Sequence, residues 1–356
     1  GGGVNPLRGQ NNVQGACDMG ALPNVYPAYQ QVANDDVRRK FEAAWGAALS
    51  PKPGLTIMEM MAAAGQGKIK AIYIMGENPL LSDPDLHHVK KELEKLDLLV
   101  VQDIFLTETA AIADVVLPSA SFAEKDGTFS NTERRVQRVR KALEPPGEAK
   151  SDWEILCGIS NRFGYPMNYA SAREIFEEVA QVTPSYAGIT YKRIEREGIQ
   201  WPCPTSEHKG TKFLHKDKFS RGLGLFSAIE YIAPAELPDQ DYPFLMTTGR
   251  VLYHYHTGTM TRRAKGPSER YPASLVEINP VDADKLNIAD GQDVLVASRR
   301  GEVKAKAQIT EKSAPGTIFM NFHFTDTPVN VLTNPALDPV GKIPEYKVCA
   351  VKLQAA

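Results

Sequence analysis

The first half of the chain is organised as apolar strand patterns separated by helix patterns. Short, nearly continuous apolar runs, typical of strands buried on both faces, occur at residues 70–75, 96–103 and 114–118. Between the first two runs, Asp83-Pro84 opens a helix pattern whose apolar face is formed by Leu86, Val89, Leu93 and Leu96. A short helical stretch, 107–112, precedes the third run. This order predicts a βαβαβ unit, that is, a parallel sheet with helices above and below it.

Other helices are indicated by their starts. From Asp35, the apolar residues Val37, Phe41 and Trp45 recur every four positions, and Gly46 ends the pattern. A Ser or Thr followed three residues later by Glu forms a capping box, and such pairs occur at Thr56/Glu59, Ser151/Glu154 and Ser171/Glu174. The sequence between Ser119 and Ser151 is polar, and we expect an irregular loop that leads into one strand after Glu133.

The last third of the chain is rich in strand patterns. It follows an irregular stretch, 185–240, which is rich in Pro, Gly and Lys and is interpreted as a connection. The predicted strands are residues 244–250, 274–280, 292–299, 302–309, 316–323 and 347–353. Asp290-Gly291 and Arg300-Gly301 are turn signals, the second typical of a hairpin, and Asn279-Pro280 opens a short helix. The pattern predicts a small β-barrel.

Composition narrows the class of protein. The 356 residues are 42% hydrophobic and carry 41 basic and 43 acidic side chains, a net charge of −2. This near balance argues against bulk binding to nucleic acid or to an anionic membrane. No apolar run approaches the roughly 18 residues of a membrane span, and no export signal precedes the first motif. We expect a cytoplasmic protein, or a periplasmic one that an exported partner carries.

The residues that commonly bind metals form no local site. The four cysteines, Cys17, Cys157, Cys203 and Cys349, lie far apart without a CxxC pair, so neither a zinc knuckle nor an iron–sulfur motif can form locally. His254 and His256 would share one face of a strand, but no third ligand follows nearby. We therefore expect no metal ligated by this chain.

Polar residues follow the predicted parallel strands, at the edge where such sheets bind ligands. They are Gly76-Glu77-Asn78-Pro79 and Gln102-Asp103. Asp103 can accept hydrogen bonds from a ribose diol or from the N1–H and N2–H2 edge of guanine, or it can cap the structure that follows. The basic residues between Arg134 and Lys141 are likewise consistent with a solvated face or with a loop that faces a phosphate or a pterin.

Three stretches resemble one protein family. GVNPLRGQNNVQGACDMG resembles a loop of molybdenum- or tungsten-dependent formate dehydrogenases, which belong to the bis-molybdopterin-guanine-dinucleotide (bis-MGD) oxidoreductases. IMGENPLLSDPD and VVQDIFLTETAAIADVVLPSASFAEKDGTFSNTERRVQ are similar to the family's guanine-dinucleotide-binding α/β domain. VEINPVDADKLNIADGQDVLVASRRGEV is similar to its C-terminal pterin-binding barrel. The resemblance covers nearly the whole chain in family order, and the choice of formate dehydrogenase rests mainly on the first stretch.

The resemblance implies roles for individual residues. Arg8 matches the arginine beside the metal that orients formate, which suits a planar guanidinium because it can clamp a carboxylate through two hydrogen bonds. Gln10 would contact the pterin, and Gly9 would allow close approach of the backbone. Asp103 and Thr107 match positions that hold a guanosine. The further cofactor contacts that we expect are Gly76, Asn78, Gln102, Asp152, Arg250, His254, Asn334 and Lys347. His256 stands where the family usually has Ser.

The resemblance also implies what the chain lacks. In the family, the cysteine or selenocysteine that binds the metal, the adjacent histidine and the cysteines of a [4Fe-4S] cluster precede the loop that contains Arg8. We therefore interpret the chain as the C-terminal half of a catalytic subunit, inert alone. The expected partner is an N-terminal half with these groups, and further electron-transfer subunits are expected as well. The bis-MGD cofactor with Mo or W would be shared between the two halves.

The expected domain organisation follows from this interpretation. The fold class is α/β, with a doubly wound parallel-sheet dinucleotide-binding domain followed by a β-barrel of the molybdopterin-oxidoreductase type. Residues 1–66 would hold the active-site loop and helices of a domain that the N-terminal half completes. Residues 67–184 would form the MGD-binding domain, residues 185–240 a connection, and residues 241–356 the pterin-dinucleotide-binding barrel.

The expected activity is the reversible two-electron oxidation of formate to CO2. One alternative is another reaction of the same superfamily, such as nitrate reduction, against which the RGQNNVQG stretch argues. A second is a structural subunit that keeps the fold without the chemistry, against which Arg8, Gln10 and Asp103 argue. A third, a nucleotide-binding regulator, leaves the first loop unexplained.

Overall fold

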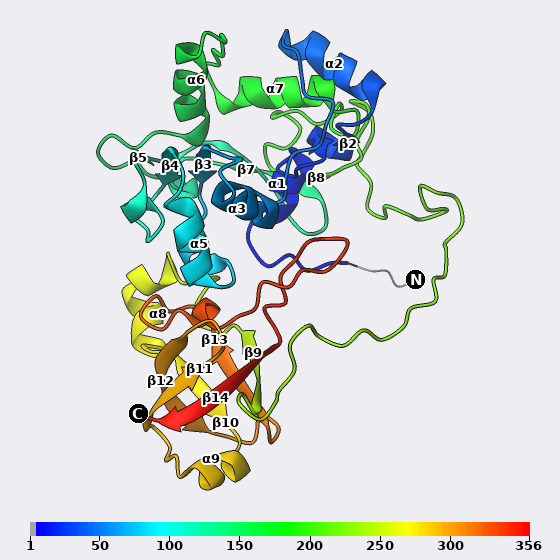
Figure 1. Cartoon of the computed structure of the whole chain (residues 1–356). Helices are drawn as coiled ribbons and strands as arrows, with labels where there is room; N and C mark the ends of the chain where they lie inside the picture. The colour runs from blue at the N-terminus through cyan, green and yellow to red at the C-terminus, as the bar shows by residue number, and fades with distance from the viewer. Residues whose placement is uncertain (1–4) are drawn as a thin grey trace. The chain divides into compact units, whose positions relative to one another are not determined.

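The computed structural model of the chain describes residues 5–356, which form two compact units (Figure 1). The first unit contains the described residues up to 56 together with residues 117–229. The second contains residues 57–116 and 230–356. Each unit is therefore built from two stretches of chain that are distant in sequence.

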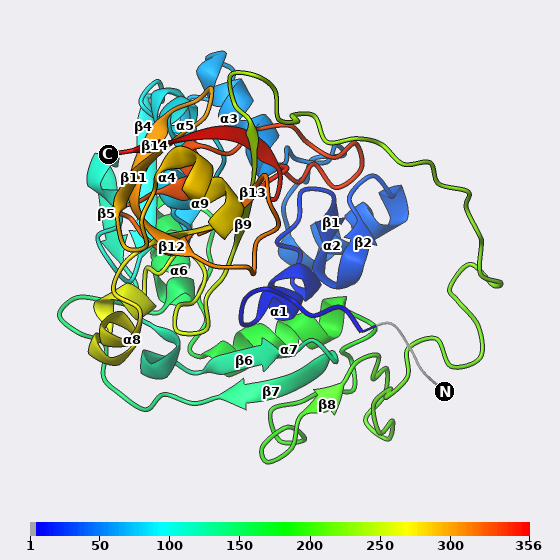
Figure 2. The ribbon, with the colours of Figure 1, turned by 90° about the horizontal axis from the view of Figure 1, so that it is seen from below.

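The first unit consists of helices around a small antiparallel sheet (Figure 2). Its helices are α1 (Val13–Asp18), α2 (Asp35–Trp45), α6 (Asp152–Arg162) and α7 (Ala172–Val182), with the short 3-10 turns η1 (Pro27–Tyr29) and η3 (Phe122–Glu124). Its sheet is β6 (Gly127–Ser130), β7 (Arg135–Val139) and β8 (Ile199–Gln200), and β1 (Val25–Tyr26) pairs with β2 (Gln30–Gln31). The strand expected after Glu133 is confirmed as β7, whereas the sequence pattern did not reveal β6, its hairpin partner.

Helix boundaries in this unit follow their predicted caps. The side chain of Ser171 accepts a hydrogen bond from the backbone N–H of Glu174 at the start of α7. Ser151 and Glu154 form a complete capping box at α6. Gly46 adopts a left-handed φ of 62° after α2, a conformation that favours glycine. These local devices therefore fix the helix ends as the sequence indicates.

The core of the first unit includes residues from the stretch predicted to be a connection. The buried side chains are Val136, Phe176, Tyr186, Ile189, Tyr191, Ile194 and Cys203. Most of them lie in residues 186–203, which contain no regular element except β8 among the described residues. This part of the chain is held by side-chain packing.

The second unit begins with a three-stranded sheet in the order β3-β4-β5. Its elements are α3 (Ile57–Gly65), β3 (Ala71–Met75), α4 (Pro79–Ser82), α5 (Leu86–Leu93), β4 (Leu98–Asp103), η2 (Ala110–Ile112) and β5 (Val115–Pro118). β3 and β4 are parallel, as predicted. Met61, Val89 and Leu93 from the helices pack with Ile74, Leu99 and Val101 of the strands.

Two expectations about this region are wrong. The strands were expected to be buried on both faces, but Tyr73 and Met75 of β3 remain 38% and 47% exposed, because α3 and α5 pack on the opposite face, with Ile74. The helix expected after Asp83-Pro84 is confirmed as α5, with Leu86, Val89 and Leu93 buried, but its start is wrong, because it begins only at Leu86, after the separate short helix α4. Asp85 adopts a left-handed φ of 50° between the two helices, so the chain turns there and continuous helix is interrupted.

The C-terminal part of the second unit is a closed six-stranded barrel, as predicted. The strand order is β10-β12-β11-β14-β9-β13. The strands are β9 (Phe244–Gly249), β10 (Leu275–Ile278), β11 (Asp293–Ala297), β12 (Glu302–Ile309), β13 (Thr317–Asn321) and β14 (Cys349–Ala355), with η4 (Thr261–Arg263), α8 (Lys265–Arg270), α9 (Pro280–Leu286) and η5 (Val329–Val331) between them. Val276, Ile278 and Met246 are among the side chains that fill its interior.

Alternating burial explains the barrel locally. The inward side chains of β12 are Val303, Ala305 and Ala307, while the residues between them are exposed, as the period of two in a strand requires. Gly291 has a φ of 75° in the turn before β11, and Asn279 caps α9 by accepting a hydrogen bond from the N–H of Val281 at 3.0 Å. The Arg300-Gly301 turn joins β11 and β12 as an antiparallel hairpin.

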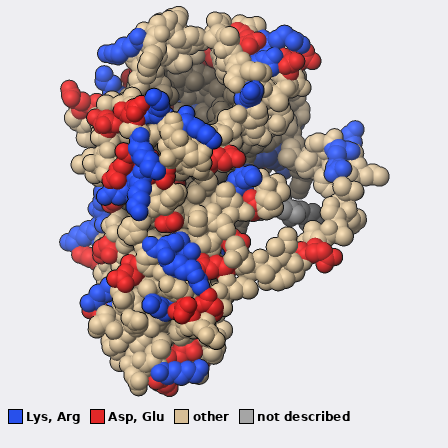
Figure 3. Space-filling view, viewed as in Figure 1, with Lys and Arg blue, Asp and Glu red and all other residues tan. Residues whose placement is uncertain are grey.

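Basic and acidic side chains are interspersed on the face of the molecule that Figure 3 shows. Ion pairs account for part of this mixing: Asp293, for example, lies 3.1 Å from Lys304 and 3.0 Å from Lys306. Among the described residues, no helix is both long and apolar enough to cross a lipid bilayer.

Candidate functional site

In the first unit, the loop that carries Arg8 lines a cavity of about 300 Å³. The cavity is lined by Arg8 to Gln14 on one side and by Phe129 to Thr132 and Gln137 on the other. Asn12, in a left-handed conformation, accepts a hydrogen bond from the N–H of Ser130 at 2.9 Å, which fastens the start of α1 to β6. The structure therefore brings together Arg8, Gly9 and Gln10 of the predicted site residues.

Arg8 is exposed, and its contact with Gln14 leads into a buried network. Its Nη2 lies 3.4 Å from Oε1 of Gln14, and Nε2 of Gln14 donates to Oδ1 of Asp18 at 2.7 Å. The hydroxyl of Tyr29 donates to the same carboxylate oxygen at 3.0 Å. The network joins the loop to the core of the unit.

Asp18 is a fully buried carboxylate at the centre of this network. Its Oδ2 accepts hydrogen bonds from the hydroxyl of Tyr186 and from Nε1 of Trp201, both at 2.6 Å. Burial and the neighbouring Asp18 charge raise the pKa of Tyr186, so its proton stays on the phenol and is donated. Four donors compensate the desolvation of this carboxylate, which would otherwise be costly to bury.

In the second unit, the predicted residues at the strand ends hold the local fold. Asn78 accepts hydrogen bonds at Oδ1 from the N–H and hydroxyl of Thr109 and donates from Nδ2 to Glu108 at 2.7 Å. Oδ1 of Asp103 accepts from the N–H of Phe105 at 3.1 Å, which is a turn contact. Oγ1 of Thr107 accepts from the N–H of Ala110 at 3.2 Å at the start of η2.

The remaining strand-end residues are close to the same edge. The N–H of Gly76 donates to the carbonyl of Gln102 at 2.9 Å, and Gly76 has a φ of 66°. Gln102 is fully buried and accepts a hydrogen bond from the hydroxyl of Tyr73. Asp152 belongs to the first unit, at the start of α6, where it forms an ion pair with Lys125.

A second cavity, of about 270 Å³, lies wholly within the second unit. It brings the predicted Arg250 and Lys347 together with His256. The guanidinium carbon of Arg250 and Nζ of Lys347 lie 5.7 and 5.5 Å from the ring centre of Phe322. Lys347 also donates to the carbonyl of Thr248 at 2.7 Å. Burial, and then the Arg250 charge, lower the pKa of both Lys347 and His256.

Asp83 is an acidic residue that lines this cavity. It is 4% exposed, and among the described residues its Oδ2 has no hydrogen-bond donor, although Ser82 donates to its Oδ1 at 3.1 Å. Burial raises the pKa of Asp83 to about 6, and the nearby Glu77 adds to the shift. Burial, followed by Asp103, raises the pKa of Glu77 as well. A buried acceptor without a donor is uncommon in native proteins, and Oδ2 of Asp83 has the capacity to accept a hydrogen bond from an N–H or O–H group in the cavity.

Asn330 fixes the end of α4, and with it Asp83, beside the barrel. Its Nδ2 donates to the carbonyls of Leu81 and Ser82 at 2.9 and 3.2 Å. These carbonyls lie in the last turn of α4, where intrahelical donors are missing. The contact therefore fixes Asp83, the residue after α4, next to the segment that follows β13.

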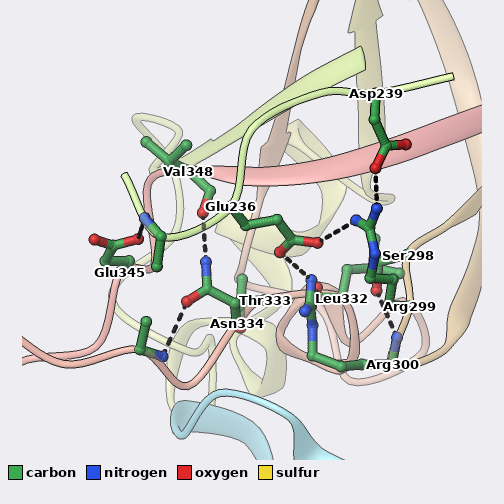
Figure 4. A network of polar contacts seen from close by, with 12 residues as sticks. Glu236, Asp239, Ser298, Arg299, Arg300, Leu332, Thr333, Asn334, Glu345 and Val348 are labelled. Atoms are coloured by element: carbon green, nitrogen blue, oxygen red, sulfur yellow. Dashed lines mark hydrogen bonds and ion pairs between the residues drawn. The ribbon is translucent and has the colours of Figure 1, made fainter. Parts of the chain in front are cut away.

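Two predicted contacts in the barrel lie elsewhere. His254 is buried, with Nε2 2.7 Å from the carbonyl of Tyr271 and Nδ1 3.2 Å from Oγ1 of Thr261. Asn334 donates to the carbonyl of Val348 at 2.8 Å and accepts from the N–H of Ala336 at 2.9 Å (Figure 4). Both side chains bond to groups of the barrel and its loops, and neither lines the cavity that contains Arg250.

The basic run between Arg134 and Lys141 is paired within the first unit. Arg138 lies 3.1 Å from Glu195, and Arg140 contacts the same carboxylate at 3.0 Å. Lys141 pairs with Glu144, and Arg135 with Glu133. Arg134 donates to the carbonyls of Trp201, Thr211 and Lys212. These contacts favour the interpretation of the run as a structural, solvated face.

Sequence reasoning missed the groups that support the predicted residues. Gln14 and Asp18 stand inside the motif that contains Arg8, but nothing in their spacing indicates a buried carboxylate with aromatic donors from residues 186 and 201. Asp83 was interpreted only as the start of a helix. Among the described residues, no cluster of three or more His, Cys, Asp or Glu side chains could hold a metal ion.

Comparisons with known proteins give two family matches. The family described as "Molybdopterin oxidoreductase" matches residues 1–162, and that described as "Molydopterin dinucleotide binding domain" matches residues 244–350. Residues 163–243 lie between the two matches.

Two similar relatives and one solved structure extend this result. An F420-dependent formate dehydrogenase subunit alpha of Methanocaldococcus jannaschii is 59% identical over 99% of this chain and 52% of its own length. An assimilatory nitrate reductase catalytic subunit of Bacillus subtilis is 38% identical over 99% of this chain and 51% of its own. The chain thus spans about half the length of these relatives. Acetylene hydratase from Pelobacter acetylenicus shares the fold, with a TM-score of 0.68 at 17% identity over 90% of this chain and 50% of its own.

Proposed function

Because residues 1–162 and 244–350 match the two molybdopterin families, we propose that the chain is a molybdopterin oxidoreductase and part of the catalytic subunit of a formate dehydrogenase or CO2 reductase. In this proposal the complete subunit interconverts formate and CO2 with transfer of two electrons. The formate dehydrogenase relative, at 59% identity, supports formate over nitrate, for which the relative is 38% identical. The observation that carries the proposal is the link from Arg8 through Gln14 to the buried Asp18.

Arg8 is the residue that we propose to orient formate. Its guanidinium is planar and permanently charged, and it can donate two parallel hydrogen bonds to a carboxylate. Both donors on Nε2 of Gln14 point to Asp18 and Tyr29, so its acceptor oxygen remains directed to Arg8. The loop thereby favours one direction for the guanidinium before substrate binds, which reduces the entropy lost on binding.

In the proposal, the cavity in the second unit contacts part of one dinucleotide of the bis-MGD cofactor, since its volume of about 270 Å³ is smaller than the whole group. Arg250 and Lys347 supply cations for phosphate, Phe322 offers an aromatic face, and Asp83 offers an unmatched acceptor for ring N–H groups. Asp103, Thr107, Gly76, Asn78, Gln102 and Asp152 remain predicted contacts from the family resemblance, as do His254 and Asn334. When bound, the cofactor with Mo or W would supply the two-electron redox chemistry.

The proposal includes a further polypeptide that completes the active site. A polypeptide corresponding to the rest of the relatives' length would supply the thiolate or selenolate ligand of the metal, a histidine and a [4Fe-4S] cluster. It would complete the sheet of the second unit as a doubly wound dinucleotide-binding domain. The division into residues 1–66, 67–184, 185–240 and 241–356 stays a prediction, and we propose a cytoplasmic location with further electron-transfer subunits.

The test is formate-dependent reduction of a viologen dye by the assembled catalytic subunit, with Mo and W measured in the same sample. We expect turnover with formate and about one metal per subunit. Metal without formate turnover, but with nitrate turnover, would identify the alternative reaction. A subunit without Mo or W would instead indicate the structural alternative, in which the fold is kept without the chemistry.

A further inference from the structure

Residues 213–232 carry large apolar side chains that are exposed along the whole segment. The nine are Phe213, Leu214, Phe219, Leu223, Leu225, Phe226, Ile229, Tyr231 and Ile232. Five of these, from Leu223 onward except Leu225, are at least 85% exposed. All twenty residues are described, and they contain no helix or strand beyond a single bridge between Phe219 and Gly222. Figure 1 draws the segment as a long yellow-green trace.

The composition of this segment differs from that of a flexible linker. Flexible linkers are rich in Gly, Ser and charged residues and poor in aromatic and branched apolar residues. From residue 223 onward, the odd positions carry Leu223, Leu225, Ile229 and Tyr231, and the even positions carry Phe226 and Ile232. In an extended chain, alternate side chains lie on the same side. Both sides of an extended chain would therefore carry apolar side chains here, and each could pack against another surface.

Both ends of the segment are fixed by polar contacts. Before it, Nη2 of Arg134 donates to the carbonyls of Thr211 and Lys212 at 3.1 and 3.3 Å. After it, Glu236 forms ion pairs of 2.7 Å with both Arg299 and Arg300 (Figure 4). These contacts, one within each unit, hold the backbone just before and just after the apolar stretch.

The exposed apolar area is large for a free surface. Phe226 and Tyr231 can each bury roughly 150–250 Å². With the four aliphatic side chains Leu223, Leu225, Ile229 and Ile232, the total reaches on the order of 800 Å², the area that one partner contributes to a standard protein interface. The largest apolar patch of a typical monomer is about 300–600 Å². The segment therefore resembles half of an interface.

We propose that residues 213–232 form the surface against which the remaining half of the catalytic subunit packs. The inference rests on the proposed function, because it takes that half to be the portion of the relatives that this chain does not span. Relatives that align with 99% of this chain carry this region together with a further polypeptide of about equal length. The segment also lies between the two matched domains, where it can connect them while contacting a third part.

The charged residues of the segment indicate which charges the partner surface should carry. Lys216, Lys218 and Arg221 outnumber Asp217 in its first part, with Lys212 just before it, whereas Glu230 is the one charged residue from 222 to 232. The partner surface is therefore an apolar groove with acidic side chains at the end that meets residues 212–221. Such a rim would favour association at low salt more than at high salt.

Hydrogen–deuterium exchange in the assembled catalytic subunit tests this proposal. Backbone amides of residues 223–232 should exchange at least about tenfold more slowly than expected for an uncovered chain. The variant Phe226→Glu should raise exchange throughout the segment and increase proteolytic cleavage there, because burying an unpaired carboxylate is unfavourable. The control is Phe163→Glu, since Phe163 is 87% exposed at the end of α6 and lies outside the segment. The control should leave the exchange pattern unchanged.

The outcomes separate this inference from the proposed function. Protection that Phe226→Glu abolishes supports the interface even if formate is not turned over. Rapid exchange of residues 223–232 in an assembly that turns over formate overturns it. Protection that vanishes together with a change from dimer to monomer in light scattering would assign the surface to a second copy and also overturn it. So would protection that requires anionic lipid vesicles.

Discussion

Gln14 donates its side-chain amide to Asp18 at 2.7 Å, and this bond decides which end of the amide faces Arg8. An amide has one acceptor oxygen and one donor nitrogen, which differ in chemistry although they are similar in shape. Because Nε2 of Gln14 donates to the buried carboxylate of Asp18, Oε1 of Gln14 faces the guanidinium of Arg8, at 3.4 Å. A fully buried residue thus orients an exposed one through a single side chain.

Asp18→Asn should disturb both stability and orientation. The new amide would place N–H groups against donors from Tyr186 and Trp201 or from Gln14 and Tyr29. Hydrogen bonds to charged groups contribute about 1.5–3 kcal/mol each, so we expect a loss of about 3 kcal/mol in the free energy of unfolding. We also expect kcat/KM for formate to fall by roughly tenfold at unchanged cofactor content. Urea unfolding and formate kinetics on the assembled subunit measure the two effects.

Trp201→Phe is the matched control for this prediction. It removes one donor to Oδ2 of Asp18 and leaves the contact of Gln14 with Oδ1 in place. It should lower stability while leaving kcat/KM for formate nearly unchanged. Equal losses of kcat/KM in both variants would show that Asp18 acts only through stability.

Arg8→Lys should reduce formate turnover without loss of cofactor. A lysine keeps the charge but presents a point donor, so it cannot form the two parallel hydrogen bonds of a guanidinium with a carboxylate. We expect turnover to fall by about an order of magnitude or more, with Mo or W content unchanged. The control is Arg39→Lys, because Arg39 is an exposed residue of α2 paired with Asp36. Wild-type turnover in Arg8→Lys would remove Arg8 from the mechanism.

Much of the fold follows from local sequence patterns. Capping residues such as Ser151 and Asn279 act within one turn of the chain, and their helices begin where predicted. The barrel strands have the alternation that a closed sheet requires. The region after Asp83 could not be predicted in this way, because the left-handed Asp85 and the tertiary contact of Asn330 with the end of α4 are set by distant parts of the chain.

The composition of the second cavity depends on strand pairing that sequence spacing does not reveal. Arg250 follows β9 and Lys347 precedes β14, and these strands are antiparallel neighbours, so the two cations meet beside Phe322. The family resemblance named both cations without this geometry. It did not indicate Asp83, whose unmatched acceptor is visible only when burial and hydrogen bonds are known. Asn334 was named as a cofactor contact, which stays a prediction; in the structure its amide donates to the carbonyl of Val348.

Asp83→Asn should weaken cofactor binding and at the same time stabilise the empty protein. An amide can present a donor where the cavity now offers an acceptor, so we expect the assembled subunit to retain less guanine dinucleotide. Removing the buried charge should at the same time stabilise the empty protein at pH 7 by on the order of 1–3 kcal/mol. Extraction and quantification of the nucleotide, with thermal unfolding of the cofactor-free protein, measure the two effects.

Asp103→Ala is the comparison for this prediction, because the family resemblance assigns the guanosine to Asp103. Loss of nucleotide in Asp103→Ala but not in Asp83→Asn would contradict the role of Asp83. The pH dependence of the empty protein gives a second check. With a folded pKa of about 6, above the ordinary value of 3.8, Asp83 contributes stability below pH 4 that is lost as the pH rises to 6.

His323 should produce the opposite pH dependence. It is fully buried, its Nε2 accepts from the N–H of Val251 at 2.9 Å, and its Nδ1 donates to the carbonyl of His256. These bonds require the neutral ring, and burial lowers the pKa of His323 to about 4 from the ordinary value of 6.5. Its contribution to stability is therefore full above pH 6.5 and is lost as the pH falls towards 4.

The consequence reaches the cavity, since Val251 and His256 lie on the loop that carries Arg250. Acidification from pH 6.5 to pH 4 should loosen this loop and release the cofactor before the rest of the barrel unfolds. His323→Gln, which can accept from Val251 through an uncharged amide oxygen, should flatten the pH dependence of cofactor release, measured by dialysis across this range. His88→Gln, at an exposed position of α5, is the control. An unchanged pH profile in His323→Gln would assign the acid sensitivity to other groups.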